Sequence, residues 1–420
     1  MDVQITPRRL RGTVTPPPSK SVTHRLIIAA GLAGGESIIE NVMLSQDIKA
    51  TLGCIAALGG TWEMTAPGIL RIRGFGGRRI SGKLPRFDCG ESGSTLRFFL
   101  PIALAVAGGG VFTGRGRLME RPQQPYWDLF DQRGITHRLT AGVLTVRGRL
   151  TPGVYYLPGN VSSQFFTGLL LALPLLSGPS RIIPTTAVES AAYLHLTLSA
   201  LSAAGVTAVD GGEEGFGIVP ASYRPFFRHV EADWSQAAFW YAASFLGGDV
   251  VIRGLDTDSL QGDQVITALT RRLSAPGDVT VDVSGCPDLL PPLAVMAAGR
   301  SGVTVFTHAG RLRLKESDRL SSTAALLRAL GVWVQETRDS LFVTGSFPAR
   351  GDGSGGTPAD SCLTGGEVDG ADDHRIVMAA AVASSICRGL VTIRGAEAVN
   401  KSYPSFWGDF KCLGGEFHVL

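Results

Sequence analysis

One pattern of hydrophobic and polar positions recurs six times along the chain. In each copy an apolar stretch with helical spacing runs to a glycine, and a β-branched or alternating stretch follows at once. The copies read CIAALGGTWEM, LFDQRGITHRL, LSALSAAGVTAV, RRLSAPGDVTVDV, LRALGVWVQ and FKCLGGEFHVL, of which the fourth fits least well. Glycine is favoured directly after a helix because it adopts a left-handed backbone without a steric penalty. The pattern therefore predicts six helix–glycine–strand junctions.

The spacing of these junctions indicates an internal repeat. Their glycines are Gly59, Gly134, Gly205, Gly277, Gly331 and Gly414. Single junctions of this kind occur in any α/β protein, but repetition at intervals of about 70 residues favours a repeated supersecondary unit. Six units of this length fill the 420 residues.

Three of the predicted helices are apolar on every side. They read STLRFFLPIALAVA, QFFTGLLLALPLL and HRIVMAAAVASSI. A helix without a polar face is buried all round. We therefore expect these helices in an interior with sheets outside, which inverts the usual layering in which helices cover a sheet.

Composition and the remaining segments set limits on the class of protein. The length fits about two domains, and a net charge of +3 gives no bulk attraction for nucleic acid. The longest apolar runs, 98–106 and 165–176, are shorter than the roughly 20 residues of a membrane-spanning helix. Residues 1–14 read as a first strand rather than a signal peptide, and the glycine-rich segment 348–366 as a mobile surface loop. Six cysteines without CxxC and seven histidines without HExxH predict structural thiols, no metal site and a cytoplasmic protein.

Polar residues gather at the starts of five predicted helices. The openings are PPPSKSVTHRLIIAAGL, DCGESGSTLRFFLPIALA, GNVSSQFFTGLLLAL, AGRLRLKESDRLSSTAALLRALG and DGADDHRIVMAAAVAS. A helix start presents unpaired N–H groups and the positive end of the helix dipole, so it favours anions. In the first opening Ser21 is a candidate cap, and Arg25 follows one turn later. At each opening a simple cap or a solvated charged turn remains the alternative.

Together these residues suit a substrate pair that carries several phosphate and carboxylate groups. Arg121 and Lys401 add further cations, and Asp288 opens another apolar helix. Arginine binds carboxylates and phosphates through two parallel hydrogen bonds, and lysine acts as a point charge. The carboxylates are then left for proton transfer.

In order and spacing these motifs resemble those of the EPSP synthase (3-phosphoshikimate 1-carboxyvinyltransferase) family over essentially the whole chain. The motifs are PxSKSxxxR at Pro17–Arg25, GESGSTLR, SSQ, RLKESDR, DDHR and NKSYPSFW. The resemblance implies transfer of the enolpyruvyl group of phosphoenolpyruvate to the 5-hydroxyl of shikimate 3-phosphate, in the shikimate pathway to chorismate and the aromatic amino acids. It implies no metal and no organic cofactor.

The resemblance also implies the fold, an α/β protein built as a two-domain inside-out α/β barrel. Each domain would hold three repeated βαβαββ units with buried helices and outer sheets. The first, discontinuous domain would comprise residues 1–15 and 233–420, and the second residues 16–232. The active site would lie in a cleft between the domains that closes on substrate. We expect a monomer that acts on small molecules, without nucleic-acid or membrane partners.

Site residues follow from the same resemblance. Shikimate 3-phosphate would contact Lys20, Ser21, Arg25, Ser162, Ser163, Gln164, Ser190, Tyr193, Asp288 and Lys315. Phosphoenolpyruvate would contact Lys20, Gly93, Arg121, Gln164, Arg319, Arg375 and Lys401. Asp288 resembles the base that takes the 5-hydroxyl proton, and Glu316 the acid that protonates the methylene carbon. Lys20, Lys315 and His374 would assist at the reacting groups. Gly93 is either a close approach to phosphoenolpyruvate or only a turn residue with positive φ.

Two departures and two alternatives accompany this assignment. Glu91 stands where many members of the family carry Asn, and Arg311 where some members do. A carboxylate at position 91 should repel phosphoenolpyruvate unless it is paired. The related enolpyruvyl transferase that acts on UDP-N-acetylglucosamine carries a reactive cysteine before an Arg-Pro pair, but this chain has no cysteine between Cys89 and Cys286. A non-catalytic anion-binding paralogue would not need both Asp288 and Glu316.

Overall fold

The computed structural model describes residues 1–345 and 363–420, which divide into two compact units. Unit 1 comprises Met1–Pro17 and Ala232–Leu420, and unit 2 comprises Pro18–Glu231. The chain therefore leaves unit 1 near its start and returns to it after completing unit 2.

Unit 2 contains three four-stranded sheets of one design, with strand orders β14-β3-β5-β4, β6-β7-β9-β8 and β10-β11-β13-β12. In each sheet the first two strands pair parallel and the last two pair antiparallel. The strands are β3 (Glu36–Glu40), β4 (Thr61–Ala66), β5 (Ile69–Arg73), β6 (Arg86–Asp88), β7 (Gly109–Thr113), β8 (Thr136–Thr140), β9 (Val143–Arg147), β10 (Gly153–Leu157), β11 (Ser180–Pro184), β12 (Ala208–Asp210), β13 (Phe216–Ile218) and β14 (Phe227–His229). The helices are α1 (Lys20–Leu32), α2 (Gln46–Ala57), α3 (Gly93–Ala107), α4 (Gln124–Gln132), α5 (Ser163–Ala172) and α6 (Ala192–Ala203).

Unit 1 repeats the design in two four-stranded sheets, β16-β17-β19-β18 and β20-β21-β1-β22, and adds a two-stranded sheet, β15-β2. Its strands are β1 (Val3–Thr6), β2 (Arg11–Val14), β15 (Asp249–Ile252), β16 (Val279–Asp282), β17 (Val303–Thr307), β18 (Val334–Glu336), β19 (Leu341–Thr344), β20 (Gly366–Asp369), β21 (Val391–Arg394) and β22 (Glu416–Val419). The helices are α7 (Trp234–Phe245), α8 (Ile266–Ser274), α9 (Leu290–Ala298), α10 (Arg319–Ala329), α11 (His374–Ala383) and α12 (Phe406–Cys412).

The predicted helix–glycine–strand junctions are all present. Each junction glycine has a positive φ, from 65° at Gly134 to 93° at Gly59, and each follows a helix and precedes a strand. Five copies of the unit are complete. The fourth, the loosest in sequence, is shortened, because β16 after Gly277 opens the next sheet instead of closing its own.

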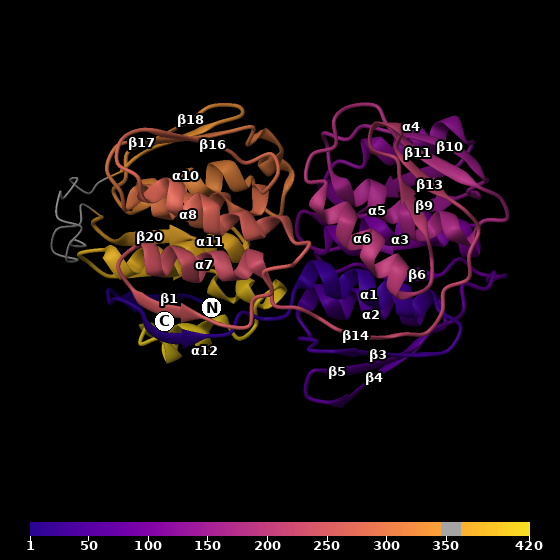
Figure 1. Cartoon of the computed structure of the whole chain (residues 1–420), viewed down its shortest axis with the longest axis horizontal. Helices are drawn as coiled ribbons and strands as arrows, with labels where there is room; N and C mark the ends of the chain where they lie inside the picture. Colours follow the sequence, from indigo (N-terminus) through magenta and orange to yellow (C-terminus); the bar gives the residue numbers. More distant parts are fainter. Residues whose placement is uncertain (346–362) are drawn as a thin grey trace. The chain divides into compact units, whose positions relative to one another are not determined.

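The helices that are apolar on every side lie inside, as predicted. In Figure 1, α11 lies between the sheets of unit 1, and α3 and α5 lie between those of unit 2, whereas α12 lies at the outer edge of unit 1. Every residue of α11 is buried, and so are nine of the ten residues of α5 and twelve of the fifteen residues of α3. Since these helices have no polar face to present to water, only an interior position satisfies them.

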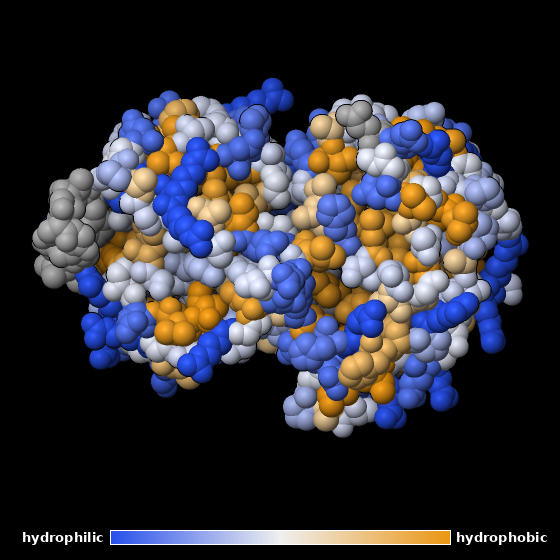
Figure 2. Space-filling model, viewed as in Figure 1, coloured by the Kyte–Doolittle hydropathy of each residue, from blue (hydrophilic) through white to orange (hydrophobic). Residues whose placement is uncertain are grey.

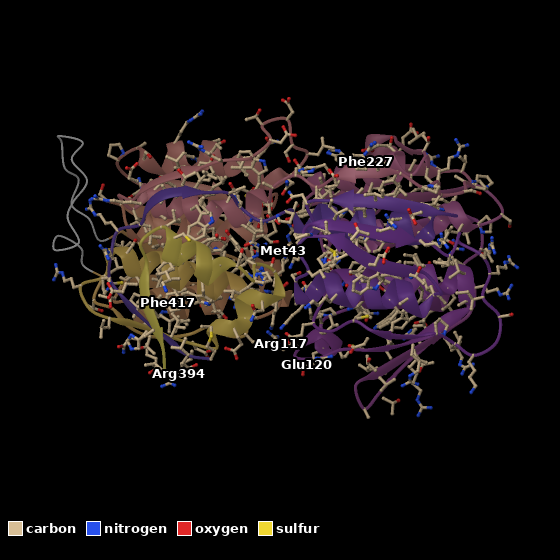
Figure 3. The ribbon with its side chains drawn as sticks, turned by 90° about the horizontal axis from the view of Figure 1, so that it is seen from below. Met43, Arg117, Glu120, Phe227, Arg394 and Phe417 are labelled. Atoms are coloured by element: carbon tan, nitrogen blue, oxygen red, sulfur yellow. The ribbon has the colours of Figure 1, made fainter. Side chains whose placement is uncertain are left out.

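The sheets present their outer faces to solvent. In the sheet that contains β1, Arg394 lies on the outer side (Figure 3), where it donates to Glu367 Oε2 at 2.9 Å and to Asp2 Oδ2 at 3.0 Å. Phe417 of β22 packs against Trp407 of α12, with ring centroids 4.8 Å apart. Trp333 is a hydrophobic residue with 60% of its surface exposed. On the face seen in Figure 2, hydrophobic residues are interspersed with charged ones. Single exposed hydrophobic side chains are normal on a protein surface.

Two segments, 1–14 and 348–366, carry predictions from the sequence that the structure corrects or describes only in part. Residues 1–14 form two short strands in different sheets, β1 and β2, rather than one strand; Pro7 lacks an N–H and cannot continue the first ladder. Most of the segment 348–366 lies outside the described residues; its last four residues include the buried Leu363 and Gly366, which opens β20. Among the described residues, no helix is long and apolar enough to cross a membrane.

Two glycines of one helix test the capping argument. Gly53 lies within α2 and Gly59 just after it with a φ of 93°, and a Cβ on either would meet nothing within 4 Å. Gly53→Ala should therefore raise the free energy of unfolding by about 0.5–1 kcal/mol, whereas Gly59→Ala should lower it by about 1 kcal/mol, because only Gly59 has a positive φ. Urea unfolding of both variants measures this. A stabilising Gly59→Ala would contradict the capping role.

Candidate functional site

Arg319, the first residue of α10, is the centre of a buried charge cluster in unit 1. Its side chain is 1% exposed and is bonded by three carboxylates. Its Nε donates to Asp373 Oδ2 at 2.9 Å, its Nη1 to Asp288 Oδ1 at 2.8 Å, and its Nη2 to Glu316 Oε2. We call Asp288, Lys315, Glu316, Arg319, Asp373 and Arg375 the Arg319 cluster.

Asp373 holds Arg319 from a fixed position. It is the N-cap of α11, is fully buried, and accepts the backbone N–H of Arg375 at 3.0 Å. It also accepts the hydroxyl of Ser317 at 3.1 Å and a second bond from Arg319, at 3.2 Å from Nη2 to Oδ1. A carboxylate with this many donors is locked in place.

Asp288 is surrounded by three cations. Besides Arg319, it accepts from Lys315 Nζ at 3.1 Å and from Arg375 Nη2 at 3.1 Å. Burial alone would raise the pKa of Asp288, but the positive charges of Arg375, Lys315 and Arg319 outweigh it and hold the pKa well below the usual value. Burial lowers the pKa of Lys315, and the negative charge of Asp288 offsets part of that effect. Asp288 is therefore ionised at neutral pH.

The repeat explains why these side chains meet. Asp288 lies in the short turn Pro287–Leu289 before α9, Lys315 and Glu316 precede α10, and Asp373 begins α11. The three helices contact one another. Their polar openings therefore assemble at one end of the bundle, although up to 87 residues separate the bonded partners Asp288 and Arg375.

The remaining predicted residues of unit 1 lie around this cluster or beside it. Lys401 is buried and donates to the carbonyl of Asp372 at 2.7 Å, where Asp372 has a positive φ of 51°. His374 is 1% exposed, with Nδ1 at 3.8 Å from Asp373 Oδ1. Arg311 donates to the carbonyl of Ser284. The structure thus places His374 beside Asp373, which is itself bonded to Arg319.

Arg25, in unit 2, is a buried cation held by neutral groups. Its Nε donates to Thr197 Oγ1 at 2.9 Å, its Nη2 to Thr167 Oγ1 at 3.4 Å, and its Nη1 to the carbonyl of Ser21 at 2.7 Å. Its guanidinium also lies over the Tyr193 ring, 5.9 Å from the centroid. Burial lowers the pKa of Arg25 to about 10, which leaves it charged at neutral pH. Among the described residues, the hydrogen-bond and ring partners of Arg25 are hydroxyls, a carbonyl and aromatic rings, so its positive charge is not cancelled by a carboxylate.

The opening of α1 differs from the prediction in one detail. The N-cap is Ser19, not Ser21, and its side chain accepts from Val22 N. Ser21 is the second residue of the helix, which leaves its hydroxyl outside the cap. Lys20 pairs with Asp47 of α2, with Nζ and Oδ2 3.0 Å apart. At the start of α1, Arg25 is thus bonded to the carbonyl of Ser21, whereas Lys20 is bonded to Asp47 of α2.

Gly93 and Arg121 touch directly. Gly93 is the first residue of α3, and its φ does not lie in the left-handed region, so the turn explanation for this glycine is wrong. A Cβ at Gly93 would lie 2.6 Å from Arg121 Nη1. A Cβ at Gly93 would therefore force the Arg121 guanidinium to shift. Glu91 is half-buried in the turn just before this helix.

Arg97 of α3 positions the segment that carries Arg121. It donates to Gln123 Oε1 at 3.2 Å, to the carbonyl of Pro122 at 2.9 Å, and to Gln164 Oε1 at 2.8 Å. Gln164 in turn donates to Ser94 Oγ at 2.9 Å. One arginine thereby fixes two predicted contact residues, Arg121 through its neighbours and Gln164 directly.

The predicted hydroxyl groups lie at two helix starts of unit 2. Ser162 is the N-cap of α5 and accepts from Gln164 N at 3.3 Å, and Ser163 is the first residue of that helix. Ser190 is buried just before α6 with a φ of 56°, an uncommon conformation for a residue other than glycine. Its carbonyl accepts Tyr193 N at 3.1 Å. Backbone strain of this kind clusters at functional sites.

The structure adds residues to which the sequence argument gave no role. Asp47, Thr167 and Thr197 hold the two basic side chains of α1. Thr167 and Thr197 are fully buried in apolar helices, and a lone hydroxyl in such a helix is the signal that could have found them. Asp373 belongs to the DDHR motif, and the structure adds its bonds to Ser317 and Arg319. Among the described residues, no group of three or more His, Cys, Asp and Glu side chains could hold a metal ion.

Comparisons with known proteins agree with this architecture and chemistry. The chain matches the family model for EPSP synthase (3-phosphoshikimate 1-carboxyvinyltransferase) over residues 5–410. The 3-phosphoshikimate 1-carboxyvinyltransferase of Clostridium kluyveri is 42% identical, with 99% of this chain and 97% of the relative covered. That of Clostridium novyi is 39% identical, with 99% and 98% covered. The solved EPSP synthase of Acinetobacter baumannii has the same fold, with a TM-score of 0.80 at 24% identity and 100% of both chains covered.

The depressed pKa of Asp288 predicts how stability depends on pH. A carboxylate whose folded pKa lies below its unfolded value, near 4, stabilises the protein fully above that pH and loses the effect as pH falls through the folded pKa. At pH 7, Asp288→Asn should lower the free energy of unfolding by roughly 3 kcal/mol, because Lys315, Arg319 and Arg375 each lose one carboxylate partner. The difference from the unsubstituted protein should shrink below about pH 4. Urea unfolding at pH 7, 5 and 3 measures it, and a difference independent of pH would refute the assignment.

Proposed function

The chain belongs to the EPSP synthase (3-phosphoshikimate 1-carboxyvinyltransferase) family, and from this premise we propose that the clusters around Arg319 and Arg25 serve its reaction. The enzyme is a transferase that moves the enolpyruvyl group of phosphoenolpyruvate to the 5-hydroxyl of shikimate 3-phosphate. The products are 5-enolpyruvylshikimate 3-phosphate and inorganic phosphate. This reaction belongs to the shikimate pathway to chorismate and the aromatic amino acids.

We propose an addition followed by an elimination. Glu316 protonates the methylene carbon of phosphoenolpyruvate, which makes the adjacent carbon electrophilic. The 5-hydroxyl oxygen adds to that carbon while Asp288 takes its proton, and a tetrahedral intermediate forms. The C–O bond to phosphate then breaks, and a methyl proton returns to Glu316 as the new double bond forms. Each placed proton transfer contributes roughly 10²–10⁴ in rate.

The observation that carries the proposal is that one buried arginine contacts both of these carboxylates. Arg319 donates to Asp288 and to Glu316, so the proposed base and acid lie on either side of a single cation. An anionic substrate bound at that cation would be within reach of both. Arg375 and Lys401 are buried nearby on the same unit and would share the negative charge of phosphoenolpyruvate.

On unit 2 we propose that Arg25 binds the carboxylate of shikimate 3-phosphate. Its unbalanced buried charge supports this assignment, since every described partner is a hydroxyl, a carbonyl or an aromatic ring. The hydroxyls of Ser162, Ser163 and Ser190 would bind the 3-phosphate at the starts of α5 and α6. Tyr193 and Gln164 would lie along the ring.

On these assignments each substrate would contact residues of both units. We propose that the active site lies between the units and is completed when they close on the substrates. Lys20 would contact both substrates, Gly93 and Arg121 would add to the phosphoenolpyruvate site, and Lys315 and His374 would assist at the reacting groups. Both substrates are multiply charged metabolites that do not cross membranes unaided, so we also propose that the enzyme is cytoplasmic. We propose separately that it is a monomer.

Glu316→Gln tests the function and the role of the proposed acid together. The unsubstituted enzyme should release phosphate only when both substrates are present. Glu316→Gln should still bind both substrates but lose turnover by roughly 10²-fold or more, because glutamine donates no proton to carbon. The control is Glu416→Gln, which removes an exposed carboxylate of β22 and should leave turnover unchanged. Near-normal turnover in Glu316→Gln would remove Glu316 from the mechanism; no phosphate release by the unsubstituted enzyme would remove the function.

Gly93→Ala tests the contact between Gly93 and Arg121. The new Cβ would displace the Arg121 guanidinium, so the KM for phosphoenolpyruvate should rise several-fold while that for shikimate 3-phosphate stays nearly constant. The melting temperature should change little, because the backbone at Gly93 accepts alanine. Gly53→Ala, in open space on α2, is the matched control and should change neither KM. Equal effects on both substrates would sink the argument.

A further inference from the structure

The hydrogen-bond donors of Arg319 are almost fully occupied by the protein itself. A guanidinium has five N–H donors. Asp373 takes Nε and one donor of Nη2, Glu316 takes the other donor of Nη2, and Asp288 takes one donor of Nη1. An incoming carboxylate or phosphate needs two adjacent donors for a two-point bond. It must therefore displace at least one of the three carboxylates.

Burial shows which carboxylates are able to move. Asp373 is fully buried and is further fixed by Ser317 and by the backbone of Arg375. The side chains of Asp288 and Glu316 are 17% and 22% exposed. Asp373 thus holds Arg319 from inside the protein, while Asp288 and Glu316 cover the donors on its accessible side.

We propose that Asp288 and Glu316 are internal substitutes for the anionic groups of phosphoenolpyruvate, which must displace them from Arg319 and Arg375 in order to bind. The inference rests on the proposed function and deepens it. The two carboxylates that carry out proton transfer are also the two that keep the cationic site closed to other anions. Substrate binding and preparation of the acid and base are then a single event.

The chemistry of both groups favours this coupling. A carboxylate bonded to guanidinium is held in its charged form. Asp288 is bonded to three cations, which hold its pKa well below the usual value and make it a weak base. When phosphoenolpyruvate takes over Arg319 and Arg375, Asp288 loses two of these three cations and becomes a stronger base, and Glu316 is released from its bond to Arg319. A proton-transfer group is most effective when its proton affinity is matched to the working pH.

Competition of this kind lowers the affinity for phosphoenolpyruvate by a measurable factor. A hydrogen bond to a charged group contributes enough that losing one competitor should tighten binding roughly tenfold or more. A neutral amide of the same shape competes far less for a guanidinium than a carboxylate does. Asp288→Asn and Glu316→Gln should therefore each bind phosphoenolpyruvate more tightly, although both are expected to be poor catalysts.

The test is calorimetric titration with phosphoenolpyruvate alone, without shikimate 3-phosphate, so that no turnover occurs. The proteins compared are the unsubstituted enzyme, Asp288→Asn, Glu316→Gln and the control Asp249→Asn, which removes an exposed carboxylate at the start of β15. Asp373→Asn separates displacement from a general gain of positive charge. It should weaken binding, because Arg319 loses its inner support. Circular dichroism melting establishes that each variant is folded, and two independent variants keep the test open if one is not.

Tighter binding by Asp288→Asn and Glu316→Gln, with weaker binding by Asp373→Asn and no change for Asp249→Asn, supports the inference. Unchanged, weaker or undetectable binding by both Asp288→Asn and Glu316→Gln would overturn it. Equal tightening by all four variants would also overturn it, since net charge alone would then account for the effect. The proposed function fails separately, if the unsubstituted enzyme releases no phosphate from the two substrates.

Discussion

The structure of unit 1 depends on one buried cation, the guanidinium of Arg319. A charged group this deeply buried is strongly destabilising unless opposite charges surround it with good geometry. Three carboxylates supply those charges, and each comes from the opening of a different helix. The starts of α9, α10 and α11 are therefore held together by the same contacts that gather the proposed acid and base.

Unit 2 has the same architecture but solves the burial of its cation differently. Arg25 is as deeply buried as Arg319, yet hydroxyls, a carbonyl and aromatic rings surround it. Neutral partners satisfy its donors without cancelling its charge. The two arginines thus differ in what they offer a substrate. Arg25 has an unbalanced charge ready for an anion, whereas an anion at Arg319 has to compete with the protein's own carboxylates.

The repeat could be predicted from sequence because each copy carries its own local signals. A glycine after a helix and a helix without a polar face are properties of short segments, and the structure has both at the expected places. The β16 strand is an exception, because only strand pairing shows that it opens a new sheet. The capping pattern does not distinguish Ser19 from Ser21, since either serine fits it, and only the structure shows that Ser19 is the N-cap.

The site was predictable in its residue types but not in its pairings. Motifs placed Asp288, Glu316, Arg319 and Arg375 among the candidates, but which carboxylate bonds which cation depends on how three helices pack. The bonds of Asp373 to Arg319 and of Thr197 to Arg25 could not be predicted, because one residue reads as part of a charged helix start and the other as a single hydroxyl in an apolar helix. Neither residue has a signal of its own until its arginine partner is in place.

The central claim is that the substrate anion and the protein's own carboxylates share the donors of Arg319. A crystal structure of the enzyme with phosphoenolpyruvate or a stable analogue and shikimate 3-phosphate measures this directly, through the distances from Arg319 to its partners. In the present structure Nη1 lies 2.8 Å from Asp288 Oδ1 and Nε 2.9 Å from Asp373 Oδ2. The account predicts that the ligand's oxygens replace Asp288 and Glu316 on Arg319 while Asp373 stays in place. A complex in which Asp288 and Glu316 both remain bonded to Arg319, with the ligand bound elsewhere, would contradict it.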